Sequence, residues 1–240
     1  MLPDPRWRYD EQRHSGVDFS SAGEVEAYDA YMRKMRDFAG EVAKIGDSLG
    51  LGPADTLLDL GCGTGETALG LAARCAAVHA VDVSGEMLTC AAAKARQRGI
   101  ANIAFAQAGF LTCDYPAASF DAVLSQLALH HLPDFWKHIA LTRVHRLLRP
   151  GGRLLLQDAV LPSDTGDFDR YFAGVVDAIA AAGGEKVARD TATTLRDEHP
   201  TLDWIMQGLL EKAGFALLRA DRTPPFIVTY LCEKHAHPGA

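Results

Sequence analysis

Short apolar runs alternate with helical segments through the middle of the chain, and this alternation constrains the fold more than any other feature. Each run is short enough for a buried strand, and each is followed by a segment with helical spacing of its apolar residues. Strands joined by helices run parallel in one sheet, because the connection must cross back to the same edge. The pattern predicts an α/β sheet with helices on both faces. The expected strands are Thr56–Leu60, Val78–Val83, Ile103–Gln107, Phe120–Ser125 and Arg153–Gln157.

Helical regions flank this core on both sides. Residues 24–49 carry one apolar stripe with steps of three or four, which predicts a single long helix. Residues 163–200 read as mostly helical, with a hinge expected at Ala180–Gly184. No repeat or linker interrupts the sequence, so we expect one domain over residues 1–240. A helix and a strand pair are expected to close it at Thr201–Ala213, Phe215–Asp221 and Phe226–Cys232.

Charge and cysteine content exclude several classes of protein. The chain has 24 basic and 31 acidic residues, a net charge of −7, which argues against a nucleic-acid-binding face. Its five cysteines are an odd number without a C-x-x-C pair, so we expect neither a disulfide framework nor a metal site. The polar N-terminus lacks a signal core, and no apolar run reaches membrane-spanning length. A soluble cytoplasmic protein is expected.

A glycine-rich turn, DLGCGTGE at residues 59–66, follows the first strand. Its third glycine is Gly65, whereas a dinucleotide fingerprint requires glycine at the position of Glu66. The turn also lacks the Gly-Lys-Ser/Thr of a phosphate-binding Walker loop. The carboxylate of Asp59 is electrostatically unfavourable for a phosphate but suits a ligand with an ammonium group. The turn therefore indicates a ligand that presents an amino group.

A second acid, Asp82, stands at the end of the second strand. The carboxyl ends of neighbouring parallel strands meet at one edge of a sheet, so Asp82 is expected close to the glycine turn. A carboxylate there accepts hydrogen bonds from both hydroxyls of a ribose. Together the turn and the acid predict a site for a nucleoside with free ribose hydroxyls and a cationic amino group.

With these motifs, the chain resembles the class I S-adenosylmethionine-dependent methyltransferases of the small-molecule type, in the methyltransferase type 11 group that includes ubiquinone- and menaquinone-biosynthesis-like enzymes. The resemblance covers about residues 24–160 and the final strand pair. It is strengthened by FDAVLS at 120–125, LHHL at 129–132 and LLRPGG at 147–152, which follow in the family's order. It implies a Rossmann-like seven-stranded, mostly parallel sheet with an antiparallel last strand, S-adenosyl-L-methionine as cofactor and S-adenosyl-L-homocysteine as product.

The resemblance also implies a cofactor site. Gly61, Gly63 and Gly65 line the methionine moiety. Asp59 helps to hold its ammonium group, and Asp82 takes the ribose. The full set of expected cofactor-binding residues is Tyr28, Asp59, Gly61, Cys62, Gly63, Gly65, Asp82, Val83, Met87, Gly109, Phe110, Ser125 and Gln126.

One position departs from the family's pattern. The family usually has an acid after the third strand that bonds the exocyclic amine of adenine, and Gly109 stands at that position here. Backbone groups or stacking on Phe110 are the expected substitutes.

A histidine pair follows the fourth strand. His130 has a side chain that titrates near neutral pH, so it is the candidate general base for the acceptor's proton. The alternative is that His130 and His131 only shape the loop before the next helix. Trp7, Tyr9 and Phe19 either belong to a lid or form a loosely ordered tail.

The remaining segments are assigned around the acceptor. Residues 1–50 are expected to form an N-terminal helical lid, and residues 24–160 the cofactor-binding core. A helical insert at 161–200 is expected over the acceptor pocket, and a closing helix and strand pair at 201–235. An inner apolar face on the insert favours a small, partly apolar acceptor, bound by a monomer or homodimer without nucleic acid or membrane. Its expected members are Phe168, Tyr171, Phe172, Val175 and Ile179.

Other functions stay open. The chain could be a cofactor-binding regulator without turnover, or a tRNA-modifying methyl- or carboxymethyltransferase, although its acidity argues against RNA. A nicotinamide oxidoreductase is disfavoured by Glu66, and arsenite methylation by the wide spacing of the cysteines.

Overall fold

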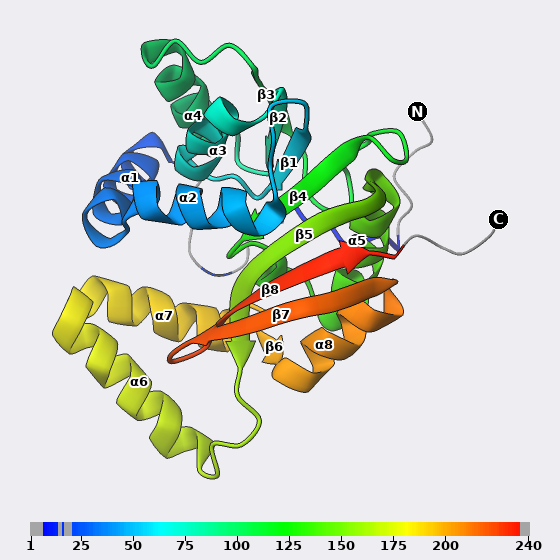
Figure 1. Ribbon diagram of the computed structural model, residues 1–240. Coiled ribbons are helices and arrows are strands. Elements are labelled where there is room, and N and C mark those ends of the chain that lie inside the picture. The colour runs from blue at the N-terminus through cyan, green and yellow to red at the C-terminus, as the bar shows by residue number, and fades with distance from the viewer. Residues whose placement is uncertain (1–6, 14–15, 17–20, 236–240) are drawn as a thin grey trace.

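The computed structural model describes residues 7–13, 16 and 21–235, apart from the side chain of Met35. Seven strands form a continuous sheet in the order β3-β2-β1-β4-β5-β8-β7, and a two-residue strand, β6, pairs with the far end of β5 (Figure 1). Phe19 of the expected lid lies outside the described residues. The strands are β1 (Thr56–Leu60), β2 (Ala77–Asp82), β3 (Ile103–Gln107), β4 (Phe120–Gln126), β5 (Leu148–Leu161), β6 (Thr201–Leu202), β7 (Phe215–Thr223) and β8 (Ile227–Lys234).

The strand directions confirm the predicted Rossmann-like sheet. β3, β2, β1, β4 and β5 pair in parallel. The last strand, β8, runs antiparallel between β5 and β7. The carboxyl ends of β1, β2 and β4 therefore meet at one edge, which is where an open α/β sheet binds its ligand.

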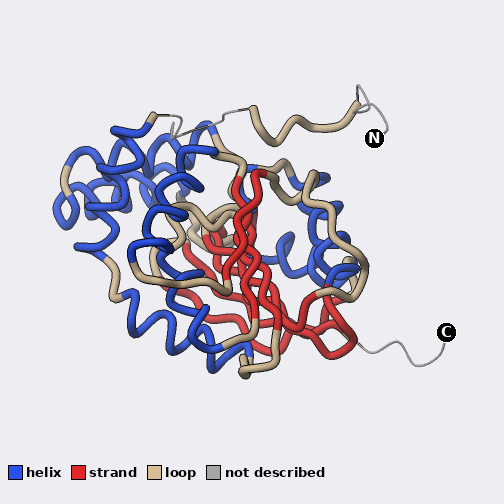
Figure 2. Tube along the Cα trace, turned by 90° about the horizontal axis from the view of Figure 1, so that it is seen from above, coloured by secondary structure: helices blue, strands red, loops and turns tan. Residues whose placement is uncertain are grey.

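Helices cover both faces of the sheet (Figure 2). They are α1 (Ala22–Met35), α2 (Phe38–Leu49), α3 (Glu66–Leu71), α4 (Gly85–Gln97), α5 (Asp134–Leu147), α6 (Phe168–Gly183), α7 (Glu185–Asp197) and α8 (Asp203–Lys212). None of the helices in the described part of the chain is long and apolar enough to cross a bilayer.

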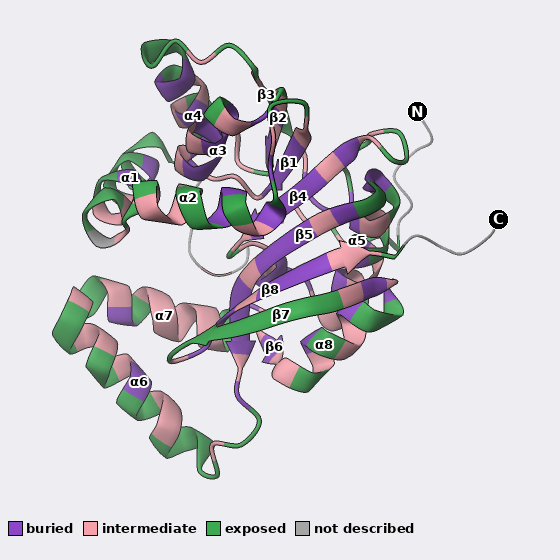
Figure 3. Ribbon diagram, in the orientation of Figure 1, coloured by how far each residue is buried: buried purple, intermediate pink, exposed green. Residues whose placement is uncertain are grey.

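The core consists of two apolar layers that use alternate residues of the same strands. Leu58 packs with residues of α5 and α8, whereas its neighbour Leu57 packs with residues of α2 and α3. Successive side chains of a strand point to opposite faces, so each strand contributes to both layers. Figure 3 shows β1, β4, β5 and β8 largely buried, while the edge strand β7 is exposed over most of its length.

The N-terminal helical region differs from the sequence expectation. Residues 24–49 form two helices, because the chain extends at Arg36 and restarts at Asp37. The Asp37 carboxylate accepts a hydrogen bond from the amide of Gly40 at 3.0 Å and so caps α2. The apolar stripe continues across the break, which is why its spacing alone predicted one helix.

Other boundaries can be compared with the sequence expectations. β5 extends beyond the expected Arg153–Gln157 at both ends, because its first residue pairs with β4 and its last four residues pair with β8 or β6. Thr201 and Leu202 were expected in a helix but pair with β5, so α8 begins at Asp203. The expected hinge at Ala180–Gly184 contains the break between α6 and α7, at Gly184.

Candidate functional site

The glycine turn lies at the carboxyl end of β1, against the end of β2. The amides of Gly61 and Cys62 both donate to the carbonyl of Val81, at 2.8 and 3.0 Å. Gly61 has a φ of 75°, and a Cβ there would lie 2.3 Å from the Cβ of Ala128. Position 61 therefore requires glycine, both for its backbone conformation and for the close approach of the loop after β4.

Asp82 links this turn to the start of α4. One of its carboxylate oxygens accepts from the amide of Gly63 at 2.8 Å, and the other accepts from the amide of Ser84 at 2.9 Å. Burial raises the pKa of Asp82, although these backbone hydrogen bonds oppose the shift. Since Asp82 also lines the main cavity, a ligand hydroxyl there would meet a carboxylate that the backbone already holds in place.

Asp59 and Arg36 bring opposite charges to one small space. Asp59 is only 3% exposed, and burial, assisted by nearby Asp82, raises its pKa to about 7, while Arg36 acts against the shift. Both side chains line a small cavity beside the glycine turn, together with Tyr28 and Cys62. Burial raises the pKa of the Cys62 thiol well above its usual value, so this thiol is neutral. An acid and a base at one end of a pocket suit a zwitterionic amino-acid group.

The main cavity has a volume of about 450 Å³ and lies between the strand ends, the N-terminal segment and the loop after β4. It shares wall residues with the small cavity, so the two form neighbouring parts of one site. The structure brings most of the predicted residues together around them. The main cavity is lined by Tyr28, Gly61, Gly63, Asp82, Val83, Met87, Gly109, Phe110 and Gln126, and the small one also by Asp59 and Cys62.

Two predicted cofactor residues lie outside the described lining of both cavities. Gly65 caps α3 with a φ of 78°, and a Cβ there would come within 2.8 Å of the Cβ of Ala91 on α4. Ser125 is buried on β4, next to Gln126, which lines both cavities. Gly65 permits close packing behind the site, and direct cofactor contact by either residue stays a prediction.

Glu11 reaches the main cavity from the N-terminal segment, and no motif in the sequence singles it out. Its carboxylate accepts from the amide of Leu111 at 2.9 and 3.0 Å and from the hydroxyl of Thr112 at 2.6 Å. A Cβ at Gly109 would lie 2.4 Å from the carboxyl group of Glu11. Glu11 therefore places a carboxylate against the glycine that stands where an acid was expected. Only the contact reveals it, because about a hundred residues separate the two positions.

A buried ion network fixes α1 on the glycine turn. Asp29 accepts hydrogen bonds from the Thr64 hydroxyl and from Lys94 Nζ, each at 2.7 Å, and also pairs with Arg33. Lys94 Nζ lies 2.9 Å from Glu66 as well. Burial alone would raise the pKa of Asp29, but hydrogen bonds from Lys94, Thr64 and Arg33 lower it. Through this network α1 holds Tyr28 on the cavity wall.

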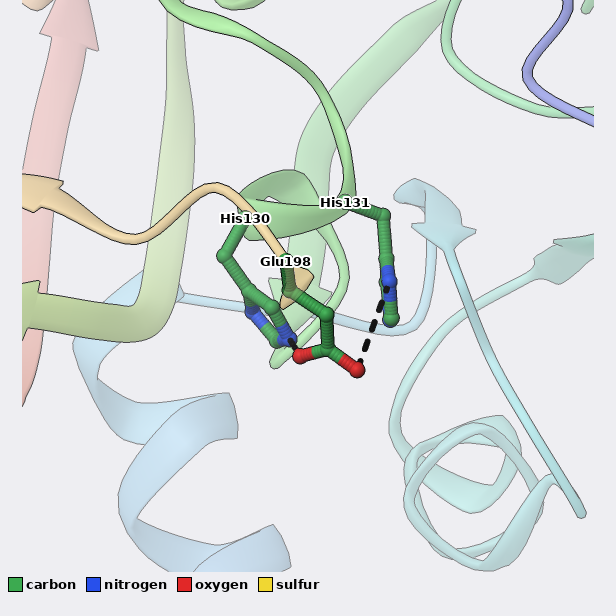
Figure 4. Close-up of side chains that lie close together, drawn as sticks. All are labelled: His130, His131 and Glu198. Carbon is green, nitrogen blue, oxygen red and sulfur yellow. Dashed lines mark ion pairs between the residues drawn. The ribbon is translucent and has the colours of Figure 1, made fainter. Parts of the chain in front are cut away.

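The histidine pair lies in a short 3₁₀ turn after β4. His130 is buried: Nδ1 pairs with the carboxylate of Asp158, and Nε2 lies 3.1 Å from Glu198 at the end of α7. Burial would lower the pKa of His130, but Asp158 and Glu198 outweigh it and raise the pKa to about 9. His131 lines the main cavity, and its Nδ1 lies 4.0 Å from Glu198 (Figure 4).

This geometry bears on the expected role of His130. Both ring nitrogens face carboxylates, so His130 would accept an acceptor's proton only after Glu198 moves away. A general-base role for His130 stays a prediction. Asp158 and Glu198 were not predicted, because neither lies near the histidines in the sequence.

The predicted lid and roof reach the site to different extents. Trp7 is 72% exposed and stacks on Trp136, whereas the Tyr9 hydroxyl donates to the carbonyl of His131 and its ring lines the main cavity. In the insert, α6 and α7 border a separate space of about 430 Å³. Its lining includes Phe172, whereas Tyr171, Val175 and Ile179 pack on Ala159 and Phe226, and Phe168 is exposed. The insert's role as an acceptor roof stays a prediction.

Comparison with known proteins agrees with this geometry. Residues 57–152 match the model of the methyltransferase domain family. The chain is 38% identical over 126 residues to 27-O-demethylrifamycin SV methyltransferase of Amycolatopsis mediterranei, covering 51% of this chain and 46% of that protein. It is 30% identical over 159 residues to an uncharacterised methyltransferase of Bacillus mycoides, covering 66% and 68%. The match spans about half the length of the first of these curated relatives.

A solved structure supports the fold over nearly the whole chain. The structure of geranyl diphosphate methyltransferase in complex with S-adenosylmethionine (SAM) superposes with a TM-score of 0.66 over 92% of this chain and 98% of that one, at 14% sequence identity. At this identity the likeness concerns the fold. The family match, the relatives and the sheet with its glycine turn all agree: the chain belongs to the methyltransferase domain family, with the class I Rossmann-like fold.

Proposed function

We propose that the two adjoining cavities bind SAM and that the protein transfers its methyl group to a small, partly apolar acceptor. The observation that carries the proposal is the placement of Asp59, Asp82 and the glycine turn around one connected site. The relatives include a methyltransferase named for a small molecule, demethylrifamycin SV, which agrees with an acceptor of this class. The main cavity, at about 450 Å³, is within the usual size of small-molecule sites.

The residues present fit the three parts of this cofactor. Asp59 and Arg36 would hold the ammonium and carboxylate of the methionine moiety. The Asp82 carboxylate would accept from the ribose hydroxyls. Met87 and Phe110 supply apolar surface for the base, and Glu11 beside Gly109 supplies a carboxylate for its exocyclic amine.

When bound, the cofactor supplies an electrophilic methyl group on a positively charged sulfur. The chain's own task is therefore alignment of the acceptor and exclusion of water. Tyr9 and Leu132 line the main cavity and give it apolar surface near the loop that carries His131. A wall of this kind favours a small apolar acceptor over a protein surface or an RNA.

The test is transfer of label from methyl-labelled SAM to a panel of small phenols, carboxylic acids, amines and prenylated compounds, with tRNA and total protein as competitors. We expect label in the small-molecule fraction, and none for a Gly61→Val variant that is confirmed to be folded. Label in tRNA or protein would contradict the acceptor class. Micromolar binding of S-adenosylhomocysteine (SAH) without any turnover would favour the regulator alternative.

The pKa of Asp59 predicts the pH dependence of cofactor binding. Because burial raises that pKa to about 7, Asp59 is mostly protonated in the free protein at pH 5.5. An ammonium group binds the ionised form, so a proton must be released below pH 7, at a cost of about tenfold in affinity per pH unit. SAH should therefore bind about 30-fold more weakly at pH 5.5 than at pH 8 in calorimetric titrations.

5′-Methylthioadenosine is the matched control, because it keeps the base and the ribose but has no amino-acid moiety. Its affinity should change much less over the same pH range. An equal loss for both ligands would assign the pH dependence to another group and contradict the role of Asp59.

Glu11 should select for the amino group of the base. Replacing Glu11 by alanine removes a carboxylate that lies against Gly109, so SAH affinity should fall about tenfold, the value of one charge-assisted hydrogen bond. The hypoxanthine analogue, S-inosylhomocysteine, lacks the amine and should bind both proteins almost equally. Glu26→Ala, at an exposed acid on α1, is the control. An equal loss of affinity for both ligands would mean that Glu11 only holds the N-terminal segment against the site and does not contact the amino group of the base.

A further inference from the structure

Three side chains with metal-binding atoms converge beside the main cavity. His130 and His131 lie in the turn after β4, and Glu198 follows α7, 67 positions further along the chain than His131. One ligand atom from each of the three lies within 4.8 Å of the other two. Figure 4 shows the Glu198 carboxylate between the two imidazole rings, with one oxygen toward each.

The spacing of these atoms is close to that of a coordination sphere. Nε2 of His130 lies 3.1 Å from one oxygen of Glu198, and Nδ1 of His131 lies 4.0 Å from the other. Ligand atoms bound at about 2.1 Å to one metal are about 3.0–3.4 Å apart. The first distance lies in this range. The second, to the other oxygen of Glu198, exceeds it by less than 1 Å, and the ligand nitrogens of the two rings are within 4.8 Å of each other.

Asp158 orients the cluster from behind. Its carboxylate pairs with Nδ1 of His130 and accepts a hydrogen bond from the backbone amide of His130 at 3.0 Å. This contact directs Nε2 of His130 toward Glu198. A carboxylate that holds the second ring nitrogen is the usual support of a metal-binding histidine. The pair is almost completely buried, because Asp158 has no exposed surface and the His130 side chain is only 8% exposed.

The charge at this position also favours a cation. Asp158 and Glu198 bring two buried carboxylates to one buried imidazole. Lys137 of α5 donates to Asp134 and to the carbonyl of His199, so its charge is directed to that contact. A divalent ion in the cluster would neutralise the two carboxylates without a proton on His130.

We propose that Nε2 of His130, Nδ1 of His131 and the carboxylate of Glu198 bind a divalent first-row transition metal. Two imidazoles and one carboxylate favour Zn²⁺, Co²⁺, Fe²⁺ or Mn²⁺ over Mg²⁺ and Ca²⁺, which prefer oxygen ligands. His131 also lines the main cavity, so the metal would lie at the edge of the acceptor space. There it would bind an oxygen-bearing acceptor and favour its ionised form. This last role rests on the proposed methyl transfer, whereas metal binding does not.

The experiment is a titration of the chelator-treated full chain with Co²⁺, followed by visible absorption, and with Zn²⁺, followed by calorimetry. The wild-type protein should bind one ion per chain. Glu198→Gln and His131→Ala should each bind at least tenfold more weakly. Asp158→Asn should bind the metal about 10- to 100-fold more weakly, which is the usual effect of replacing a residue that supports a metal ligand. His138→Ala, at a histidine of α5 outside the cluster, should bind like the wild type.

Unchanged stoichiometry and affinity in both Glu198→Gln and His131→Ala would place the ion elsewhere and overturn the proposal, as would no binding by the wild type. Circular dichroism identifies any variant that does not fold. If one of these two variants is unfolded, the metal affinity of the other one decides whether the proposal stands. SAH titration of the same metal-free samples keeps the two proposals separate. If SAH binds and the metal does not, only the metal site is refuted.

Discussion

Replacing Lys94 by methionine is expected to lower the free energy of unfolding by about 3–5 kcal/mol, the usual cost of removing one partner from a buried ion pair. Lys94 Nζ lies 2.7 Å from Asp29 and 2.9 Å from Glu66, and all three side chains are less than 10% exposed. Methionine fills similar space but removes the ammonium group that both carboxylates share, so Asp29 keeps Arg33 and Glu66 keeps the more exposed arginines at the surface. Urea denaturation at pH 7 measures the loss.

The pH dependence of the lost stability shows whether it comes from the two buried carboxylates. Hydrogen bonds from Lys94 hold the pKa values of Asp29 and Glu66 below their usual range, against the effect of burial. The wild type therefore keeps this stabilisation above about pH 4 and loses it as pH falls through the lowered pKa values. In the variant the carboxylates become easier to protonate, so the difference between the proteins should shrink from pH 7 toward pH 4.

Lys186→Met is the matched control, because Lys186 pairs with Asp190 on the exposed surface of α7. Its free energy of unfolding should stay close to that of the wild type. A similarly small effect of Lys94→Met, or a deficit independent of pH, would show that the network does not anchor α1. SAH affinity should also fall in Lys94→Met, since α1 carries Tyr28 onto the cavity wall.

The second large effect concerns the cofactor. Asp82→Ala should weaken SAH binding at least 100-fold, which corresponds to about 2.7 kcal/mol. The variant removes the proposed acceptor of the ribose hydroxyls, and it also leaves the amides of Gly63 and Ser84 without this carboxylate. Hydrogen bonds that involve a charged group contribute about 1.5–3 kcal/mol each, so the loss of more than one explains the size of the effect.

Calorimetry on two further variants makes this prediction specific. Asp82→Asn keeps one acceptor oxygen, so its affinity for SAH should fall less than that of Asp82→Ala. Asp114→Ala, at an exposed acid after β3, should bind as the wild type does. The thermal midpoint of each variant shows whether the turn still folds. A folded Asp82→Ala protein with wild-type affinity would refute the role of Asp82.

The sequence was sufficient where a functional residue lies directly at a strand end. Gly61 follows β1 and Asp82 ends β2, so strand order and local motif together predict that they lie close to each other, and both line the main cavity. Glu11 and Glu198 come from segments far away in the sequence and meet the site only through tertiary contacts. No local pattern distinguishes such residues from the other acids of an acidic chain.

Some helix boundaries could not be predicted for a similar reason, because they too depend on contacts that the local pattern does not contain. The apolar stripe of residues 24–49 continues in phase through Arg36, so only the cap formed by Asp37 shows that α1 ends there. That break has a consequence for the site, because it directs Arg36 into the cavity beside Asp59. The expected helix start at Thr201 was wrong because β5 extends far enough to pair with it, a contact that single-sequence periodicity does not contain.

Calorimetric titration of the wild-type protein with SAH at pH 8 tests the central claim most directly. Binding of one molecule per chain with a micromolar dissociation constant is the predicted result, with the affinity typical of enzyme ligands. Absence of binding at millimolar SAH, by protein whose fold is confirmed by circular dichroism, would contradict the assignment of these cavities to the cofactor.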